Sequence, residues 1–204
     1  PQIQVQGPEV DVIYRNCGNK LSFQVAALGA DYNPTFKVTG AKVNTTSQRG
    51  EVIVIPREGE AKIDVYNNGA YIGRKKFKVR SVPKPTITLT RNGQPYKVNA
   101  LKGVSPNFLN MISVKALADK AFAKSNPADA GYKTVEYEIS IVRGNSIPYS
   151  NTYKKQGKRL REFVSRVRPG DRVVIIVKKV TRKNYLGEFE KVRMADEVFS
   201  IPII

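Results

Sequence analysis

Residues 153–183 read YKKQGKRLREFVSRVRPGDRVVIIVKKVTRK, and this stretch predicts one amphipathic helix followed by one buried strand. Apolar side chains recur at helical spacing from Leu160 to Val167, so they share one face of a helix that we expect to span residues 158–168. Arg168-Pro169-Gly170-Asp171 then predicts a tight turn. The run from Val173 to Val177 is apolar without alternation, which is typical of a strand that is covered on both faces and central in its sheet.

The same stretch is strongly basic. Its lysines and arginines face only two acidic residues, Glu162 and Asp171. Basic side chains on a solvated helix face often serve solubility alone, and binding of an anionic partner is the competing interpretation. The candidate partner-binding residues are Lys154, Lys155, Lys158, Arg159, Arg161, Arg166, Arg168 and Arg172.

Composition narrows the class of protein. The chain has 204 residues, of which 41% are hydrophobic and 25% charged, so it is long enough to bury one or two cores and is not of disordered composition. The 35 lysines and arginines exceed the 17 acidic residues and give a net charge of +18. Such a surplus favours nucleic acid, acidic protein faces or anionic head groups as partners, without choosing among them.

The residue inventory argues against an enzyme. Histidine, the commonest general base and metal ligand, is absent, and Cys17 is the only cysteine, so no intrachain disulfide can form. The acidic residues that could pair, Glu136 with Glu138 and Glu188 with Glu190, are two residues apart, as expected for the solvent face of a strand. We therefore expect no catalytic residue, no metal site and no cofactor.

The first 80 residues consist of short alternating or β-branched runs that are separated by turn residues. This pattern predicts an immunoglobulin-like antiparallel β-sandwich. Its clearest hairpin turns at Asn67-Asn68-Gly69, with Ile63, Val65, Tyr71, Phe77 and Val79 expected to face the core. The expected strands are residues 10–14, 21–25, 35–38, 51–55, 62–66 and 71–79.

Two prolines in Ser81-Val82-Pro83-Lys84-Pro85 predict an extended linker, because proline withholds a backbone donor from any sheet. We therefore expect two tandem domains, residues 1–82 and residues 83–204. The second should be β-rich and carry the short amphipathic helix, so the fold class is mainly β. In it we expect strands at 86–90, 135–142, 172–177 and 199–204, a turn at 91–95 and a short helix after Ser105-Pro106, whereas 112–122 fits a strand or a helix.

The order of these features resembles a known family. A strand at Asp11–Arg15, the Val82–Thr86 hinge, the Ser105-Pro106 turn and the run from Arg159 to Val173 resemble the C-terminal periplasmic half of the GldM or PorM proteins. That family commonly has Tyr-Arg-Gly where this chain has Tyr14-Arg15-Asn16, and here a proline precedes the Gly-Asp of the basic turn. The resemblance covers essentially the whole chain.

The resemblance implies a part of the type IX secretion and gliding machinery rather than an enzyme. Such proteins are anchored in the inner membrane by an N-terminal helix, which we expect upstream of this sequence because no run of about 18 apolar residues occurs in it. They form homodimeric rods in the periplasm. The rods couple the GldL or PorL motor protein to the outer-membrane ring of GldK and GldN or PorK and PorN, and no nucleic acid is expected as a partner.

Two other functions compete with this one. A basic nucleic-acid-binding protein fits the net charge, but the chain lacks an RNP-like aromatic strand and zinc-ligand spacing. A carbohydrate-binding or adhesin module on the sandwich would favour exposed tryptophan, and the chain has none.

Overall fold

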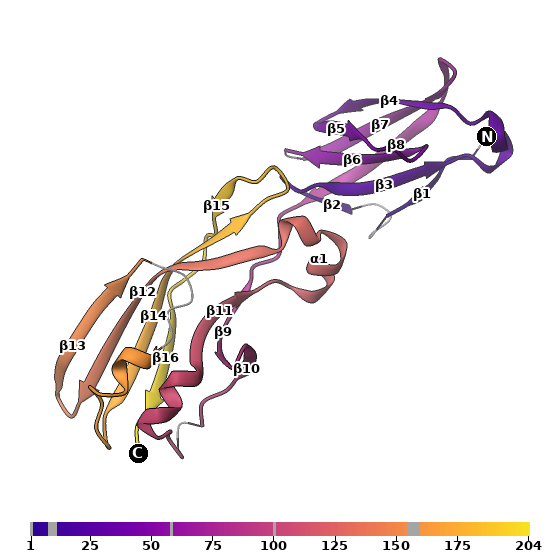
Figure 1. Cartoon of the computed structure of the whole chain (residues 1–204). Coiled ribbons are helices and arrows are strands. Elements are labelled where there is room, and N and C mark those ends of the chain that lie inside the picture. The colour runs from indigo at the N-terminus through magenta and orange to yellow at the C-terminus, as the bar shows by residue number, and fades with distance from the viewer. Residues whose placement is uncertain (1, 8–11, 58, 100, 155–159) are drawn as a thin grey trace. The chain divides into compact units, whose positions relative to one another are not determined.

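The chain folds into two compact units (Figure 1). Unit 1 comprises Pro1–Pro83, Lys120–Ala130 and Lys183–Glu188, and unit 2 comprises Lys84–Asp119, Gly131–Arg182 and Phe189–Ile204. The chain therefore passes from one unit to the other five times. The computed structural model describes residues 2–7, 12–57, 59–99, 101–154 and 160–204.

Unit 1 is built on a β-sandwich. One sheet has the strand order β1-β3-β6-β5 and the other has the order β2-β8-β7-β4, and all described pairs are antiparallel except the parallel pair of β2 with β8. The bounds are β1 Gln4–Gln6, β2 Val12–Tyr14, β3 Asn19–Gln24, η1 Ala26–Asp31, β4 Pro34–Thr39, β5 Ala41–Thr45, β6 Glu51–Pro56, β7 Glu60–Asn67, β8 Ala70–Arg80, α1 Lys120–Ser125 and η3 Pro127–Asp129, where η marks a 3₁₀ helix.

The core of this sandwich follows from the alternation of its strands. Leu21 and Phe23 on β3 and Ile63 and Val65 on β7 are fully buried, whereas their chain neighbours are not. The Phe23 ring meets the Phe77 ring edge to face at 6.3 Å between centroids, which is a favoured arrangement of two aromatic rings. The predicted sandwich is therefore confirmed. Residues 10 and 11 of the first expected strand lie outside the described residues.

The β7–β8 hairpin differs from the prediction at one residue. Its turn has positive φ at Asn68 and Gly69, as asparagine and glycine allow. A register shift after Val65 pairs Tyr66 with Tyr71, and Tyr71 is 59% exposed. The prediction that Tyr71 faces the core was wrong because this bulge reverses the alternation that a regular hairpin would keep.

Two segments from the second half of the chain belong to unit 1. Phe122 on α1 is fully buried and meets the Tyr14 ring edge to face at 5.0 Å. The buried Asp129 accepts hydrogen bonds from the backbone N–H of Gly18 at 2.9 Å and of Tyr185 at 2.7 Å. One carboxylate therefore joins three segments that are distant in sequence.

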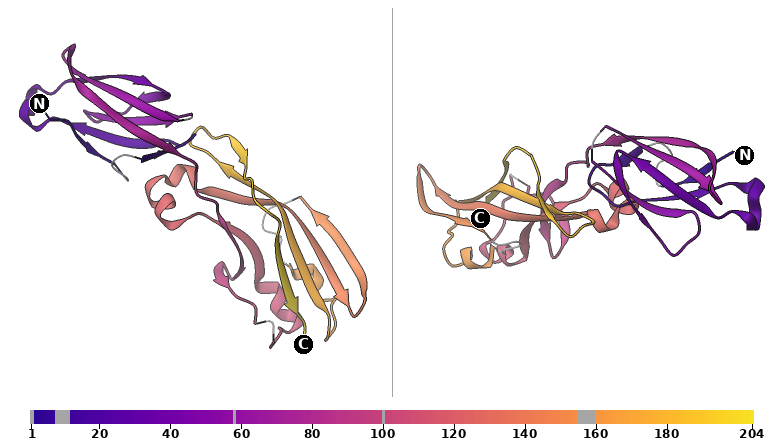
Figure 2. Two further views of the ribbon diagram at one scale, coloured as in Figure 1. Left: turned by 180° about the vertical axis from the view of Figure 1, so that it is seen from behind. Right: turned by 90° about the horizontal axis from the view of Figure 1, so that it is seen from above.

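Unit 2 contains two sheets. A three-stranded sheet has the order β10-β9-β11, and a five-stranded sheet has the order β13-β12-β14-β15 with β16 also paired to β14. The helix η4 lies against one face of the larger sheet, in front of it in Figure 1 and behind it in the left view of Figure 2. The bounds are β9 Thr86–Arg91, β10 Gln94–Tyr96, η2 Pro106–Met111, β11 Ile112–Leu117, β12 Gly131–Arg143, β13 Ser146–Tyr153, η4 Leu160–Phe163, β14 Arg172–Lys183, β15 Phe189–Lys191 and β16 Glu197–Pro202.

The expectation for β14 is largely confirmed. It is central, since it pairs with β12 on one side and with β15 and β16 on the other. Val173, Ile175 and Val177 are buried on one face, whereas Val174 and Ile176 on the other face are only half-buried. The strand is thus covered fully on one face and in part on the other.

The ambiguous stretch 112–122 contains both predicted alternatives. Its first part is strand β11, which pairs with β9 from Ile112 to Leu117. Its last residues begin the helix α1, whose Phe122 packs in unit 1. The strand spacing of its first residues and the helix spacing of its last residues each correspond to an element of the structure.

The predicted helix at 158–168 was wrong in length. Residues 158 and 159 lie outside the described part, and among the described residues only Leu160–Phe163 is helical, as the 3₁₀ helix η4. Turn residues follow from Val164 to Arg166. The predicted apolar face is nevertheless confirmed, because Leu160, Phe163 and Val167 are buried.

Replacement of Asp129 by alanine tests the carboxylate that joins three segments of unit 1. Asp129→Ala leaves the N–H groups of Gly18 and Tyr185 without their acceptor, and buried donors that lose a partner are costly. We expect the free energy of unfolding to fall by about 2–4 kcal/mol in urea titrations followed by circular dichroism. The exposed Asp31→Ala is the control, and equal stabilities of the two variants would contradict the assigned role.

Candidate partner-binding site

The basic site is organised by the tight turn before β14. Pro169 and Gly170 occupy its centre, and Gly170 has a φ of 92°, which glycine adopts without steric cost. The N–H of Asp171 donates to the carbonyl of Arg168 at 3.0 Å and closes the turn. The N–H of Gly170 donates to the carbonyl of Ile203 at 2.9 Å, so the turn is fastened to the residue after β16. The turn predicted here is confirmed.

A buried carboxylate holds this turn in place. Asp171 is 2% exposed, and its two oxygens accept hydrogen bonds from Nε and Nη2 of Arg143, each at 2.8 Å. Its Oδ2 also accepts the backbone N–H of Arg168 at 2.8 Å. The Arg143 guanidinium lowers the pKa of Asp171 below its ordinary value, because it stabilises the charged form. Paired in this way, Asp171 is part of the scaffold of the site.

Aromatic rings of β13 pack against the short helix η4. Phe163 meets Tyr149 edge to face at 5.4 Å between centroids, and Tyr153 stacks on Tyr137 at 5.8 Å. The Arg166 guanidinium lies 4.7 Å from the centre of the Tyr149 ring, within the range of a cation–π interaction. The packed aromatic rings therefore determine the position of the Arg166 guanidinium on the protein surface.

The second acidic residue of the basic stretch is also engaged. Burial, followed by the hydrogen bonds of Glu162 and Tyr149, raises the pKa of Tyr153 above its ordinary value. The hydroxyl oxygens of Tyr149 and Tyr153 are 2.7 Å apart. Since Glu162 interacts with Tyr153 and Asp171 with Arg143, both carboxylates of the stretch already have partners within unit 2.

The structure brings part of the predicted site together. Lys155, Lys158 and Arg159 lie outside the described residues. Asp171 is bonded to the Arg143 side chain and the Arg168 backbone, and Arg143 also donates to the carbonyl of Arg166 at 3.4 Å. The described candidates with exposed side chains are Lys154, Arg161, Arg166, Arg168 and Arg172.

Sequence reasoning missed Arg143, which comes from the end of β12. The signal for it was Asp171 itself, because an isolated acid in a basic run that borders an apolar strand needs a cationic partner. Arg172, at the start of β14, has a weak additional contact, with Nη1 3.5 Å from the Ser200 hydroxyl oxygen.

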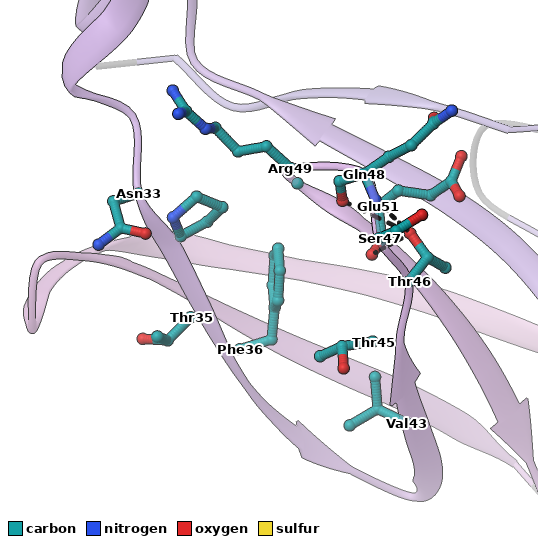
Figure 3. A pocket seen from close by; sticks show the side chains of 12 residues that line it. Asn33, Thr35, Phe36, Val43, Thr45, Thr46, Ser47, Gln48, Arg49 and Glu51 are labelled. Carbon is teal, nitrogen blue, oxygen red and sulfur yellow. Dashed lines mark hydrogen bonds between the residues drawn. The ribbon is translucent and has the colours of Figure 1, made fainter.

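Unit 1 carries a separate groove between the margins of its two sheets (Figure 3). The groove has a volume of about 480 Å³, and Phe36 stands between strands β4 and β5, which form its sides. Hydroxyl and amide side chains of the β5–β6 loop line the rest. Glu51 in this lining pairs with Lys20 at 2.9 Å, and that lysine lowers the pKa of Glu51. Arg49 donates to the carbonyl of Ala30 at 3.0 Å.

No group of three or more His, Cys, Asp or Glu residues that could hold a metal ion occurs within the described ranges. In the same ranges no helix is both long and apolar enough to pass through a membrane.

Comparison with protein families identifies both halves of the chain. The GldM third domain matches residues 2–80, and the GldM C-terminal domain matches residues 83–204. The chain belongs to the GldM family. GldM proteins are structural components of the type IX secretion and gliding machinery, so the resemblance seen in the sequence is confirmed. GldM proteins are membrane-anchored and their C-terminal part is periplasmic.

None of the curated proteins compared with the chain matches it. Among solved structures, the adhesin InvE of Yersinia pseudotuberculosis is 12% identical with a TM-score of 0.30, and the match covers 97% of this chain and 58% of the adhesin chain. The fibronectin(III)-like modules of Clostridium thermocellum CbhA are 12% identical with a TM-score of 0.28, at coverages of 99% and 94%. Scores this low carry no argument about the GldM chain.

The ion pair of Asp171 predicts a dependence of stability on pH. Because the folded-state pKa of Asp171 is lowered, the pair stabilises the fold above the unfolded pKa of about 4, and this contribution is lost as the pH falls through the folded value. Asp171→Asn should therefore lower the Tm at pH 7 by about 5 °C. The gap to wild type should narrow towards pH 2.5.

Thermal unfolding between pH 7 and pH 2.5 measures this effect. Asp196→Asn is the matched control, since Asp196 pairs with Lys178 on the surface with half of its side chain exposed. A gap between Asp171→Asn and wild type that stays constant over the whole pH range would show that the charge of Asp171 is not what stabilises the turn.

Proposed function

We propose that this GldM chain is the force-transmitting periplasmic part of the secretion machine, and that it connects the inner-membrane motor to the outer-membrane ring. The observation that carries the proposal is the match of both halves to GldM domains, residues 2–80 and 83–204. On this proposal the GldL or PorL motor protein is reached through a part of the protein outside this sequence. The ring proteins of the GldK and GldN or PorK and PorN type are the direct partners.

The connectivity of the chain supports a mechanical role. A flexible linker would damp a transmitted force, whereas proline-stiffened or multiply crossed connections resist extension. Residues 81–85 contain two prolines, and four further crossings follow after Asp119, Ala130, Arg182 and Glu188. A load is then shared over five covalent connections. The proposed domain division remains 1–82 and 83–204, with residues 120–130 and 183–188 of the second domain packed in unit 1.

The contact with the ring, in this proposal, uses the basic surface between Lys154 and Arg172. The Asp171 ion pair holds the turn that carries Arg168, and the Tyr149 ring holds the Arg166 guanidinium. Asp171 is paired with Arg143, and the exposed Glu162 is outnumbered by the exposed Lys154, Arg161, Arg166, Arg168 and Arg172, so the net exposed charge is positive. A surface of this kind selects an acidic protein face, with charge complementarity setting specificity and the rate of association.

Charge reversal tests this contact. The triple variant Arg161→Glu, Arg166→Glu and Arg168→Glu should weaken binding to a purified ring protein of the GldN or PorN type by about 10- to 100-fold at 0.15 M salt. Longer-range attraction is largely screened at that ionic strength, so the loss reports short-range contacts. Biolayer interferometry with the 204-residue chain measures the affinity.

The matched control reverses three exposed lysines of unit 1, with Lys42→Glu, Lys76→Glu and Lys78→Glu. It changes the net charge equally, so equal losses in both triple variants would mean that only overall charge matters. Unchanged affinity of the arginine variant would refute the proposed contact. Duplex DNA in a parallel assay tests the alternative of a nucleic-acid-binding protein, which predicts tight DNA binding and no ring-protein binding.

We also propose that the chain forms a homodimer. Light scattering should then give a mass of about twice 22.7 kDa at micromolar concentration. A mass of 22.7 kDa would remove the homodimer from the proposal and leave the ring contact in place.

A further inference from the structure

Strand β13 is an edge strand and forms one margin of the five-stranded sheet in unit 2, as Figures 1 and 2 both show. Within the described residues it pairs only with β12. Every second residue of such a strand directs its backbone N–H and C=O away from the sheet, and these groups can pair with another extended chain. The register with β12 is continuous from Tyr149 to Tyr153.

No charged side chain occurs in β13, which at 8 residues is longer than the other uncharged edge strands of the described residues, β1, β2 and β10, with 3 residues each. Its sequence is SIPYSNTY, whereas the marginal strands β4, β5 and β16 carry Lys37, Lys42 and Glu197. Charged side chains on marginal strands prevent unwanted pairing between sheets. In β13 only Pro148 has that effect, and it lies before the continuous part of the register. Neither a charged residue nor a proline occurs from Tyr149 to Thr152, within the continuous part of the register.

The two faces of β13 differ in chemistry. On the face that carries η4, Tyr149 and Tyr153 contact Phe163, and the Arg166 guanidinium lies over Tyr149 at 4.7 Å. A chain paired with β13 would therefore meet the positive charge of Arg166 beside Tyr149, whereas the Glu162 carboxylate lies at the Tyr153 end of this face.

Hydroxyl groups dominate the opposite face. The Ser150 hydroxyl lies 2.9 Å from that of Ser140, and it donates to the Glu138 carboxylate at 3.2 Å. Thr152 pairs with Glu138 across the strands and is exposed. A carboxylate of a paired chain would be repelled here, and an uncharged side chain would be accepted.

We propose that an extended segment of the protein partner adds to β13 as a further strand. Its side chains alternate, with carboxylates on the face towards Arg166 and uncharged residues on the face towards Ser150. The proposal rests on the ring contact described above and specifies how that contact is made. Backbone hydrogen bonds supply affinity in strand addition, and the alternating side chains supply specificity.

Hydrogen–deuterium exchange of the 204-residue chain, with and without the purified ring protein, tests strand addition directly. Backbone amides that gain a partner exchange more slowly, so peptides that cover Ser146–Tyr153 should slow by about tenfold or more in the complex. The charged margin β4 is the internal control and should not change. Protection at 160–172 with unchanged exchange in β13 would overturn the proposal.

The outcomes separate the two proposals. If the charge-reversed triple variant binds the ring protein like wild type, the proposed ring contact fails, and strand addition fails with it. If charge reversal abolishes binding while wild-type binding leaves β13 exchange unaltered, the ring contact stands and strand addition fails.

A synthetic peptide of alternating threonine and glutamate provides a second test. Two versions carry N-methyl groups on alternate backbone nitrogens, one on the threonines and one on the glutamates, so their charge is unchanged. Strand addition predicts that one version loses binding by about tenfold or more and the other does not, because only one set of N–H groups faces β13. Equal affinity of all three peptides, or no binding of any, would count against strand addition.

Discussion

A carboxylate that is removed from water must be met by hydrogen-bond donors, and this requirement fixes the loops of both units. Asp129 reaches backbone groups 111 and 56 residues away in sequence, at Gly18 and Tyr185. Asp171 takes both nitrogen donors of the Arg143 fork and a backbone N–H of its own turn. The hydrophobic cores lie within the sheets, whereas these two carboxylates hold specific loops together. The position of the basic surface depends on the second of them.

Strict alternation made most strands predictable, whereas contacts between distant segments did not appear in the local pattern. Ile63 and Val65 face the core as their spacing indicates, and Tyr71 does not, because a bulge between the strands is a property of the pair. The sequence pattern around α1 was ambiguous between helix and strand because the contact that orients the helix is not local. Phe122 packs against Tyr14, more than a hundred residues earlier in the chain. Helices this short take their stability from such tertiary contacts.

The candidate site was predictable in its charge and not in its shape. A basic run with an apolar stripe indicated a long helix, but the chain turns after Phe163 so that Val167 reaches the core and Arg166 lies over Tyr149. Like charges along a short helix do little to extend it. The absence of charge in β13 can be read from the sequence. That β13 is an edge strand cannot, because only the sheet order shows that no strand among the described residues pairs with its outer side.

The interleaving of the two units also constrains the order in which the protein matures. During synthesis the chain emerges from its N-terminus, so the strands of the sandwich appear long before α1 and the segment around Tyr185. The N–H of Gly18 and the ring of Tyr14 gain the partners described above only when Asp129 and Phe122 have been made, and Asp129 accepts its second backbone N–H only when Tyr185 follows. The sandwich therefore completes its fold only after most of unit 2 has been made.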